Sequence, residues 1–301
     1  MFHKASVTEF VDFLKGSEYV CGHNILNHDI KYIGKAVKEA GIAPENIIDT
    51  LHLSPLLFPA RPYHALVKDD KLQSEDTNNP LNDSIKARNL FYDEVAAFGR
   101  TDDTFKQILY GLLKDRREFA AFFRFIGYNS GDANVEGLIR QKFKGEICGH
   151  ADLAKMISEY PVELAYALSL TNAFILHRKV HSITPPWVLR NYPKVERIMM
   201  RLRNTPCIRG CVYCNEALDI HKGLKRFFGY DTYRTFGGEP LQENAVQAAI
   251  DNKSLLAVFP TGGGKSITFQ VPALMSGENS KGLTVVISPL QSLMKDQVDN
   301  L

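Results

Sequence analysis

Residues 255–275 read LLAVFPTGGGKSITFQVPALM, and this stretch decides the fold of the C-terminal part. An apolar run precedes three consecutive glycines, and a helical pattern follows them. Glycines, which lack a Cβ, let the backbone turn tightly with its amides directed inward, where they can bind phosphate oxygens. The pattern predicts a buried strand, a phosphate-binding loop and a helix, as in an α/β nucleotide-binding domain.

The polar residues of this loop have separate expected roles. Lys265 is expected to reach the β- and γ-phosphates of a nucleotide, and Ser266 to offer its hydroxyl to Mg²⁺. Phe259 stands where the general phosphate-loop pattern has its first glycine, so the match is to the narrower variant PTGGGKS. The expected site for ATP and Mg²⁺ consists of Thr261, Gly262, Gly263, Gly264, Lys265 and Ser266.

This loop and the segment GLTVVISPLQSLMKDQVDNL at 282–301 closely resemble motifs I and Ia of RecQ-type superfamily 2 DNA helicases. The resemblance covers residues 224–301 and implies the start of a RecA-like domain. It also implies ATP-driven 3′→5′ unwinding of DNA by the full-length protein. The second segment tracks single-stranded DNA in that family, which implies DNA contacts from Ser288, Pro289 and Gln291.

The same resemblance places an adenine-reading motif upstream, within FFGYDTYRTFGGEPLQENAVQAAI at 227–250. It implies that Gln242 reads the adenine edge, with Tyr230 and Arg234 nearby. The Asp-Glu motif and the second RecA-like lobe of the family do not occur in these 301 residues. We therefore expect a fragment of a helicase that is inactive on its own.

Cysteines crowd into a short stretch before this region. Cys207, Cys211 and Cys214 lie within eight residues and His221 follows, a set that predicts a zinc knuckle at 207–222. Two alternatives remain open: an iron–sulfur cluster, which usually takes four cysteines, and structural cysteines that bind no metal.

The cysteine run and the later Gly-Gly-Glu-Pro at 237–240 also resemble the cluster-binding and methionine-binding motifs of radical SAM enzymes. In those enzymes a helix and a second strand separate the two motifs. Only 22 residues lie between Cys214 and Gly237. A radical SAM enzyme is therefore the less favoured alternative, and we interpret 237–240 as a turn shaped by glycine and proline.

The N-terminal part carries a second resemblance. YVCGHNILNHDIKYIGKAV at 19–37 and NNPLNDSIKARNLF at 78–91 resemble motifs of DEDD-type 3′→5′ exonucleases, which have an RNase H-like fold. The resemblance implies that Asp29 and Asp83 are two of four acids that hold divalent metals. The Asp-x-Glu that should supply the other two is absent from residues 1–28. An alternative role for Asp29 is to cap the following helix.

A basic segment lies between the two resemblances. Pro186–Arg226 holds nine basic residues against three acids, a balance that favours binding to a phosphate backbone. We predict that Arg197, Arg201 and Arg203 contact single-stranded or unwinding DNA; the alternative is a solvated helix face. A second functional hypothesis follows, in which the chain is a non-enzymatic DNA-binding module with a vestigial nucleotide site.

Composition sets the frame for these motifs. With 301 residues, 45% hydrophobic and 23% charged, the chain has the size of about two soluble globular domains. No apolar run approaches the ~20 residues of a membrane span, and we expect no membrane partner and a cytoplasmic location. The predicted α/β layout is a partial RNase H-like exonuclease domain (1–95), a helical connector (96–206), the zinc knuckle (207–222) and the N-terminal part of a RecA-like lobe (223–301).

Overall fold

The computed structural model describes residues 6–66, 80–176, 184–260, 262–288 and 295. The chain divides into two compact units, one up to Arg203 and one from Cys214 onward, with residues 204–213 shared between them. The predicted domain boundaries stay predictions, and one of them, at 95/96, falls inside the long helix α4 (Pro80–Arg100).

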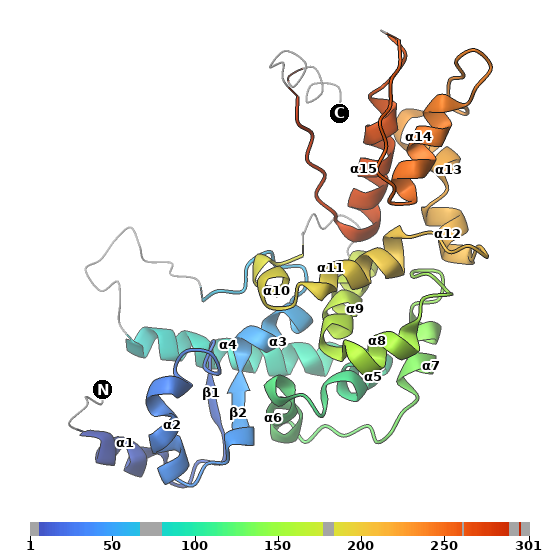
Figure 1. Cartoon of the computed structure of the whole chain (residues 1–301). Helices are drawn as coiled ribbons and strands as arrows, with labels where there is room; N and C mark the ends of the chain where they lie inside the picture. Colours follow the sequence, from blue (N-terminus) through green and yellow to red (C-terminus); the bar gives the residue numbers. More distant parts are fainter. Residues whose placement is uncertain (1–5, 67–79, 177–183, 261, 289–294, 296–301) are drawn as a thin grey trace. The chain divides into compact units, whose positions relative to one another are not determined.

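The first unit opens with a small parallel sheet. Strands β1 (Val20–Gly22) and β2 (Ile47–Asp49) pair in parallel, with Val20 opposite Ile47. Parallel neighbours need a crossover connection, and α2 (Ile30–Glu39) and the 3₁₀ turn η2 (Pro44–Asn46) provide it (Figure 1). Helix α1 (Val7–Leu14) packs on α2 through Leu14, Val37 and Ile42.

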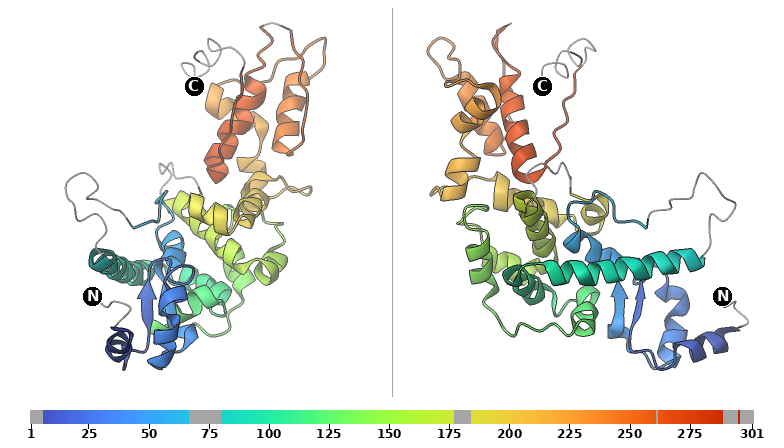
Figure 2. Two further views of the ribbon diagram at one scale, coloured as in Figure 1. Left: turned by 60° about the vertical axis from the view of Figure 1, so that its left-hand side comes forward. Right: turned by 180° about the vertical axis from the view of Figure 1, so that it is seen from behind.

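Long helices surround this sheet. Helix α4 passes along β1 and α3 (Thr50–Leu57), and the second panel of Figure 2 shows it beside both strands. Its buried face carries Ala87, Phe91 and Phe98, spaced for one side of a helix. The helices that follow are α5 (Asp103–Leu113), α6 (Arg117–Phe125), α7 (Val135–Lys142), α8 (Leu153–Glu159), α9 (Pro161–Leu176), α10 (Pro186–Asn191), α11 (Lys194–Met199) and the π-helical turn η3 (Met200–Asn204). The described residues of 96–206 are largely helical, as predicted.

The core of this helical part centres on α9. Tyr166 is buried and its hydroxyl donates to the backbone carbonyl of His52 at 2.9 Å. The hydroxyl of Tyr192 lies 2.9 Å from Nδ1 of the same histidine, and Trp187 packs edge-on against its ring. Burial within this aromatic cluster lowers the pKa of His52. The polar atoms of the cluster are therefore satisfied where water is excluded.

Two helices of the first unit approach closely at a glycine. A Cβ added at Gly111 on α5 would lie 2.3 Å from Cγ2 of Val135, the first residue of α7. Only a residue without a side chain fits this crossing.

The described part of the second unit is helical. It holds α12 (Val212–Ala217), α13 (Ile220–Phe228), α14 (Leu241–Ile250) and α15 (Ile267–Ser280), with Pro272 inside α15. The strand predicted ahead of the glycines is wrong, because residues 254–259 are irregular. The apolar run at 283–287 is irregular as well. Neither run has a partner strand in the described part of the chain, and an unpaired strand leaves its backbone unsatisfied.

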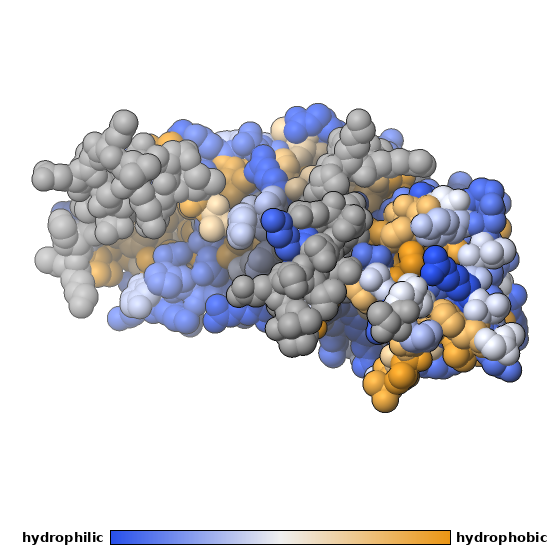
Figure 3. Space-filling model, turned by 90° about the horizontal axis from the view of Figure 1, so that it is seen from above, coloured by the Kyte–Doolittle hydropathy of each residue, from blue (hydrophilic) through white to orange (hydrophobic). Residues whose placement is uncertain are grey.

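These two runs consequently expose their apolar side chains. Figure 3 shows apolar surface, in orange, gathered at the right of the view. The exposed residues of the two runs are Leu255, Leu256, Val258, Leu283, Val285, Val286 and Ile287.

The architecture is thus mixed, with many helices and one small sheet among the described residues. The RNase H-like fold predicted for the N-terminal part is not confirmed by this two-stranded pair. None of the described helices has the length and apolar character needed to cross a membrane.

Candidate nucleotide-binding site

The phosphate loop adopts a backbone that demands glycine. Gly262 and Gly264 have φ of 76° and 67°, in the left-handed region. A Cβ at Gly263 would lie 2.9 Å from the carbonyl oxygen of Pro260. The three glycines therefore form a tight turn that side chains would obstruct, as the sequence predicted. Thr261 lies outside the described residues.

Lys265 and Ser266 follow the turn and lead directly into α15. Lys265 is exposed, and Ser266 occupies the position before the first helical residue, Ile267. The hydroxyl of Thr268 donates to the carbonyl of Lys265 at 2.6 Å and ties the loop to the first turn of the helix. Both residues thus follow the glycine turn directly and precede the helix, as the sequence predicted.

Gln242 holds the loop from the neighbouring helix. Buried at the start of α14, it donates through Nε2 to the carbonyl of Gly264 at 2.9 Å. Its Oε1 accepts from the backbone N–H of Arg234, also at 2.9 Å. Arg234 in turn donates through its guanidinium to the carbonyl of Gly262 at 3.2 Å. Both ends of the Gln242 amide are occupied by protein, whereas Tyr230 is 58% exposed.

The Gly-Gly-Glu-Pro stretch forms the predicted turn. Phe236 and Glu239 exchange backbone hydrogen bonds of 2.9 and 3.0 Å. Gly237 and Gly238 between them have φ of 60° and 86°, as a tight hairpin turn with two left-handed positions requires. The ring of Phe236 packs on Phe259, just ahead of the phosphate loop, with 5.3 Å between centroids. This turn therefore supports the loop.

Of the DNA contacts implied by the helicase resemblance, only Ser288 can be placed. It is partly buried at the end of the irregular run 283–288. Pro289 and Gln291 lie outside the described residues.

The basic segment separates into exposed and buried members. Lys194, Arg197 and Arg201 are exposed, while Val195, Ile198, Met199 and Leu202 face the core. With Lys155, these three cations line a cavity of about 190 Å³ between α8 and α11, together with Asp152, Met156, Tyr160 and Ile198. Four cations thus face one carboxylate, and Asp152 already accepts from the N–H of Lys155 as a helix cap. The Nζ of Lys194 lies 4.3 Å from the ring centre of Tyr160.

Arg203 departs from the prediction. It is buried, donates to the backbone carbonyl of Glu146 and lies over the ring of Tyr213. Its guanidinium is used inside the first unit and is not presented to a phosphate. Toward the C-terminus the cations are paired with acids: Lys222 with Glu216, Lys225 with Asp231 and Arg226 with Glu278.

The cysteines gather in a different set from the one predicted. Among the described residues one group of potential metal ligands is close together, namely Cys148, Cys207, Cys211 and Cys214, whose sulfur atoms all lie within 4.8 Å of one another. His221 is not in this group. Its Nε2 lies 3.0 Å from the carboxylate of Glu243, and its ring packs on Tyr233. The prediction of His221 as a ligand is therefore wrong, because α13 directs this side chain to α14.

Asp29 and Asp83 are likewise not brought into a metal-binding group in the described part of the chain. Asp29 precedes α2 without a side-chain cap and lies 3.3 Å from Nδ1 of His28. Asp83 lies in the first turn of α4. The metal roles implied by the exonuclease resemblance are not supported by this arrangement, nor is the capping alternative for Asp29.

Two buried carboxylates of the first unit, Asp49 and Glu94, were not predicted from the sequence as site residues. Asp49, at the end of β2, accepts from the N–H groups of Asn24, Leu26 and Leu51 at 2.8–3.1 Å. Glu94 on α4 is fully buried, and neither of its oxygens has a hydrogen-bond partner. Burial first, and then the neighbouring Asp49, raise the pKa of Glu94 well above its usual range.

Comparison with known proteins locates the phosphate loop in a family. Residues 239–301 match the DEAD/DEAH box helicases. The matched segment begins within the Gly-Gly-Glu-Pro turn and contains Gln242, the three glycines and α15, and so includes the loop described above.

Curated relatives cover the same part of the chain. ATP-dependent DNA helicase Q5 of Rattus norvegicus is 42% identical over 83 residues, 27% of this chain and 8% of that protein. ATP-dependent DNA helicase RecQ of Synechocystis sp. is 44% identical over 82 residues, 27% of this chain and 15% of that protein. RecQ of Haemophilus influenzae is 49% identical over 78 residues, 26% of this chain and 11% of that protein. The chain thus spans about a tenth of the length of these relatives. No solved structure matches the chain.

Proposed function

We propose that the matched segment, residues 239–301, is the nucleotide-binding part of an ATP-dependent DNA helicase of RecQ type. The observation that supports this proposal most strongly is the glycine turn at 262–264. Gln242 donates to the carbonyl of Gly264, and Arg234 donates to the carbonyl of Gly262. The similarity to proteins named ATP-dependent DNA helicases supports the same conclusion.

The residue types of the loop are those that bind ATP and Mg²⁺. A cradle that a Cβ would fill leaves room for phosphate oxygens beside backbone amides. Lys265 would neutralise the β- and γ-phosphates, and Ser266 would hold Mg²⁺, which supplies charge neutralisation during phosphoryl transfer. Gln242 would read adenine only by exchanging its bonds to Arg234 and Gly264, which would couple base binding to the loop. In the whole protein the proposed outcome is ATP-driven 3′→5′ unwinding.

We propose further that the cavity between α8 and α11 is where DNA phosphates bind. The cavity is lined by Lys155, Lys194, Arg197 and Arg201. Among the described residues, none of these four cations forms an ion pair with a carboxylate. Unpaired cations on one surface attract a polyanion and release its counterions on binding. This observation also favours the second candidate function, a DNA-binding module whose nucleotide site is vestigial.

A nucleotide titration tests the first proposal. Titration of the whole chain with a fluorescent ADP analogue should show binding that Mg²⁺ strengthens and that Lys265→Ala weakens at least tenfold, or about 1.4 kcal/mol. Lys253→Ala is the matched control, because Lys253 is an exposed lysine of the same unit paired with Asp251. Equal affinities for the wild type and Lys265→Ala would refute the proposal. DNA binding that survives without any nucleotide binding would establish the second candidate.

A further inference from the structure

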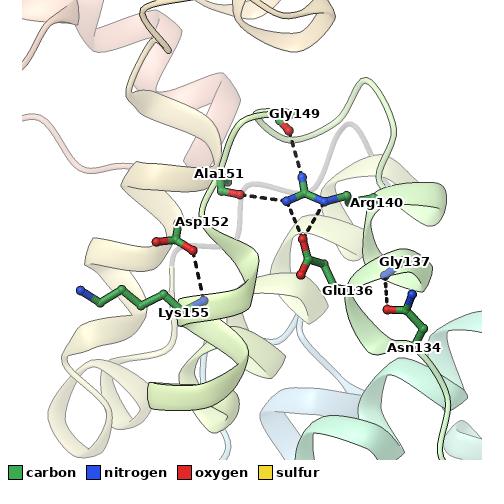
Figure 4. Close-up of polar contacts among 8 residues, drawn as sticks. All are labelled: Asn134, Glu136, Gly137, Arg140, Gly149, Ala151, Asp152 and Lys155. Carbon is green, nitrogen blue, oxygen red and sulfur yellow. Dashed lines mark hydrogen bonds and ion pairs between the residues drawn. The ribbon is translucent and has the colours of Figure 1, made fainter.

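Cys148 stands far from the other three cysteines in sequence, on a rigid loop between α7 and α8. It is buried, and its N–H donates to the carbonyl of Leu202 at 2.8 Å. Arg140 on α7 holds the residues on either side of His150, by donating to the carbonyls of Gly149 at 2.9 Å and Ala151 at 3.3 Å (Figure 4). The guanidinium is itself fixed by Glu136 one helical turn away. The Cys148 thiol is therefore presented from a backbone fixed on both sides.

The other three cysteines lie on a turn followed by a helix. The N–H of Gly210 donates to the carbonyl of Cys207 at 3.1 Å, and Gly210 has φ of 68°, which closes a tight turn just before Cys211. Cys211 directly precedes α12, and Cys214 lies three residues on, on the same side of the helix. A turn of this kind brings thiols at short spacing to one point, as in short zinc-binding motifs.

One direct contact joins the two stretches. The N–H of Gly149 donates to Sγ of Cys211 at 3.3 Å, and both residues line the same cavity of about 180 Å³ with Cys148. Backbone N–H groups directed at a ligand sulfur are common outer contacts of metal-bound cysteines. Metal-bound cysteines are thiolates, so this bond belongs to the supporting shell of a metal site.

The spacing of the sulfurs selects the kind of metal. Four sulfurs at 2.3 Å from one zinc ion form a tetrahedron with edges of about 3.8 Å, and the four here all lie within 4.8 Å of one another. A cluster of several irons spreads its cysteines farther apart, because each sulfur binds a different iron. No disulfide joins any of the five cysteines, all of which are described.

We propose that Cys148 is the fourth ligand of a structural zinc ion, held by the four thiolates of Cys148, Cys207, Cys211 and Cys214. The ion fixes the turn at 207–211 to the loop that Arg140 supports. It compensates the negative charge of thiolates that are partly or fully buried. The proposal is independent of nucleotide binding, so the two can fail separately.

Metal content of the purified whole chain tests the proposal. Mass spectrometry of the metals should find about one equivalent of zinc per chain, and Cys148→Ser should lose it. Two control variants should keep the zinc. Cys21→Ser removes the one cysteine outside the group, and His221→Gln removes the histidine seven residues after Cys214. Zinc retained in full by Cys148→Ser, or lost in His221→Gln, would overturn the assignment. Iron and sulfide in place of zinc would overturn it as well.

A second measurement uses only the wild-type chain, so it does not require that a cysteine variant folds. Alkylation of the wild-type chain, mapped by mass spectrometry, should spare Cys148 and the other three cysteines together. Brief treatment with a zinc chelator should make all four reactive at the same rate at which zinc is released. Reaction of Cys148 that is unchanged by the chelator, while the other three respond, would show that it is not a ligand.

Discussion

The side-chain amide of Gln242 donates to the backbone carbonyl of Gly264, with 2.9 Å between Nε2 and O. Because the same amide accepts from the N–H of Arg234, one buried side chain links the Gly-Gly-Glu-Pro region to the phosphate loop. The loop is thus held by a residue from another helix rather than by its own sequence alone.

Replacing this residue should loosen the loop. Gln242→Ala leaves the carbonyl of Gly264 and the N–H of Arg234 without their partner, which costs about 1–3 kcal/mol for a buried group. We expect a lower unfolding free energy in urea and weaker binding of an ADP analogue. Gln247→Ala is the control, because Gln247 is exposed on the same helix and bonds only Asp251 among the described residues. If the two variants have the same unfolding free energy and the same affinity for the analogue, the hydrogen bonds of Gln242 do not stabilise the loop.

The buried carboxyl of Glu94 should make stability depend on pH. Its pKa in the folded chain is raised, so its contribution is fully present below the ordinary glutamate pKa and is lost as pH rises through the folded value. Asp49 and Asp93 disfavour its ionisation and Arg61 favours it. Glu94→Gln keeps the shape and removes the titration. We expect the variant to gain stability over the wild type as pH rises above the ordinary glutamate pKa of about 4.3.

Urea unfolding across this pH range checks the prediction. Glu118→Gln is the control, since Glu118 is a carboxyl of the same unit that is not buried. The prediction is refuted if Glu94→Gln has the same unfolding free energy as the wild type at every pH.

The crossing of α5 and α7 should reject any side chain at Gly111. Gly111→Ala places a methyl group against Val135 and should lower stability by about 1–3 kcal/mol through overpacking. Gly99→Ala on α4 meets no atom within 4 Å and should raise stability by about 0.5–1 kcal/mol. Thermal unfolding of the two variants should therefore shift in opposite directions. Shifts of the same sign would contradict the close approach.

Salt dependence should reveal whether the cavity between α8 and α11 binds DNA. Each contact with single-stranded DNA contributes about −0.7 to the log–log slope of affinity against salt. Replacing Lys194, Arg197 and Arg201 with Ala should flatten that slope by up to about two units and leave nucleotide affinity unchanged.

A triple variant of equal charge is the control for this measurement. Lys222, Lys225 and Arg226 are also basic, but each is paired with an acid. Their replacement with Ala should change the slope less. If both triple variants behave alike, only net charge matters and the cavity has no special role.

The exposed apolar runs should bind a hydrophobic dye. Leu256 and Ile287 are 92% and 91% exposed, and Val258, Leu283 and Val285 in the same two runs are exposed as well. Exposed apolar patches of this kind bind dyes and associate. We expect strong fluorescence of anilinonaphthalene sulfonate, reduced when Leu256 and Ile287 are replaced with Ser. Fluorescence at the level of the buffer would show that these runs are covered in solution.

The sequence predicted best what depends on neighbouring residues. The glycine turn, the Gly-Gly-Glu-Pro hairpin and the helices of 96–206 follow from local backbone preference and apolar spacing. Cys148 could not be found this way, because nothing in the 58 residues before Cys207 shows that its loop returns to Leu202. His221 failed for a related reason, since Glu243 lies on another helix. The apolar runs at 254–259 and 283–287 have the composition of strands, but pairing requires other strands that composition does not supply.

Pro272 has a mechanical consequence for the phosphate loop. Proline has no N–H, so the carbonyl of Thr268 cannot receive the usual bond from the residue four positions on. The first turn of α15 therefore has one backbone bond fewer than a regular helix. Separately, the Thr268 hydroxyl donates to the carbonyl of Lys265. The proline therefore lies between the first turn of α15, next to the loop, and the later turns, which bury Met275. Amide hydrogens ahead of the proline are expected to exchange with solvent sooner than those behind it.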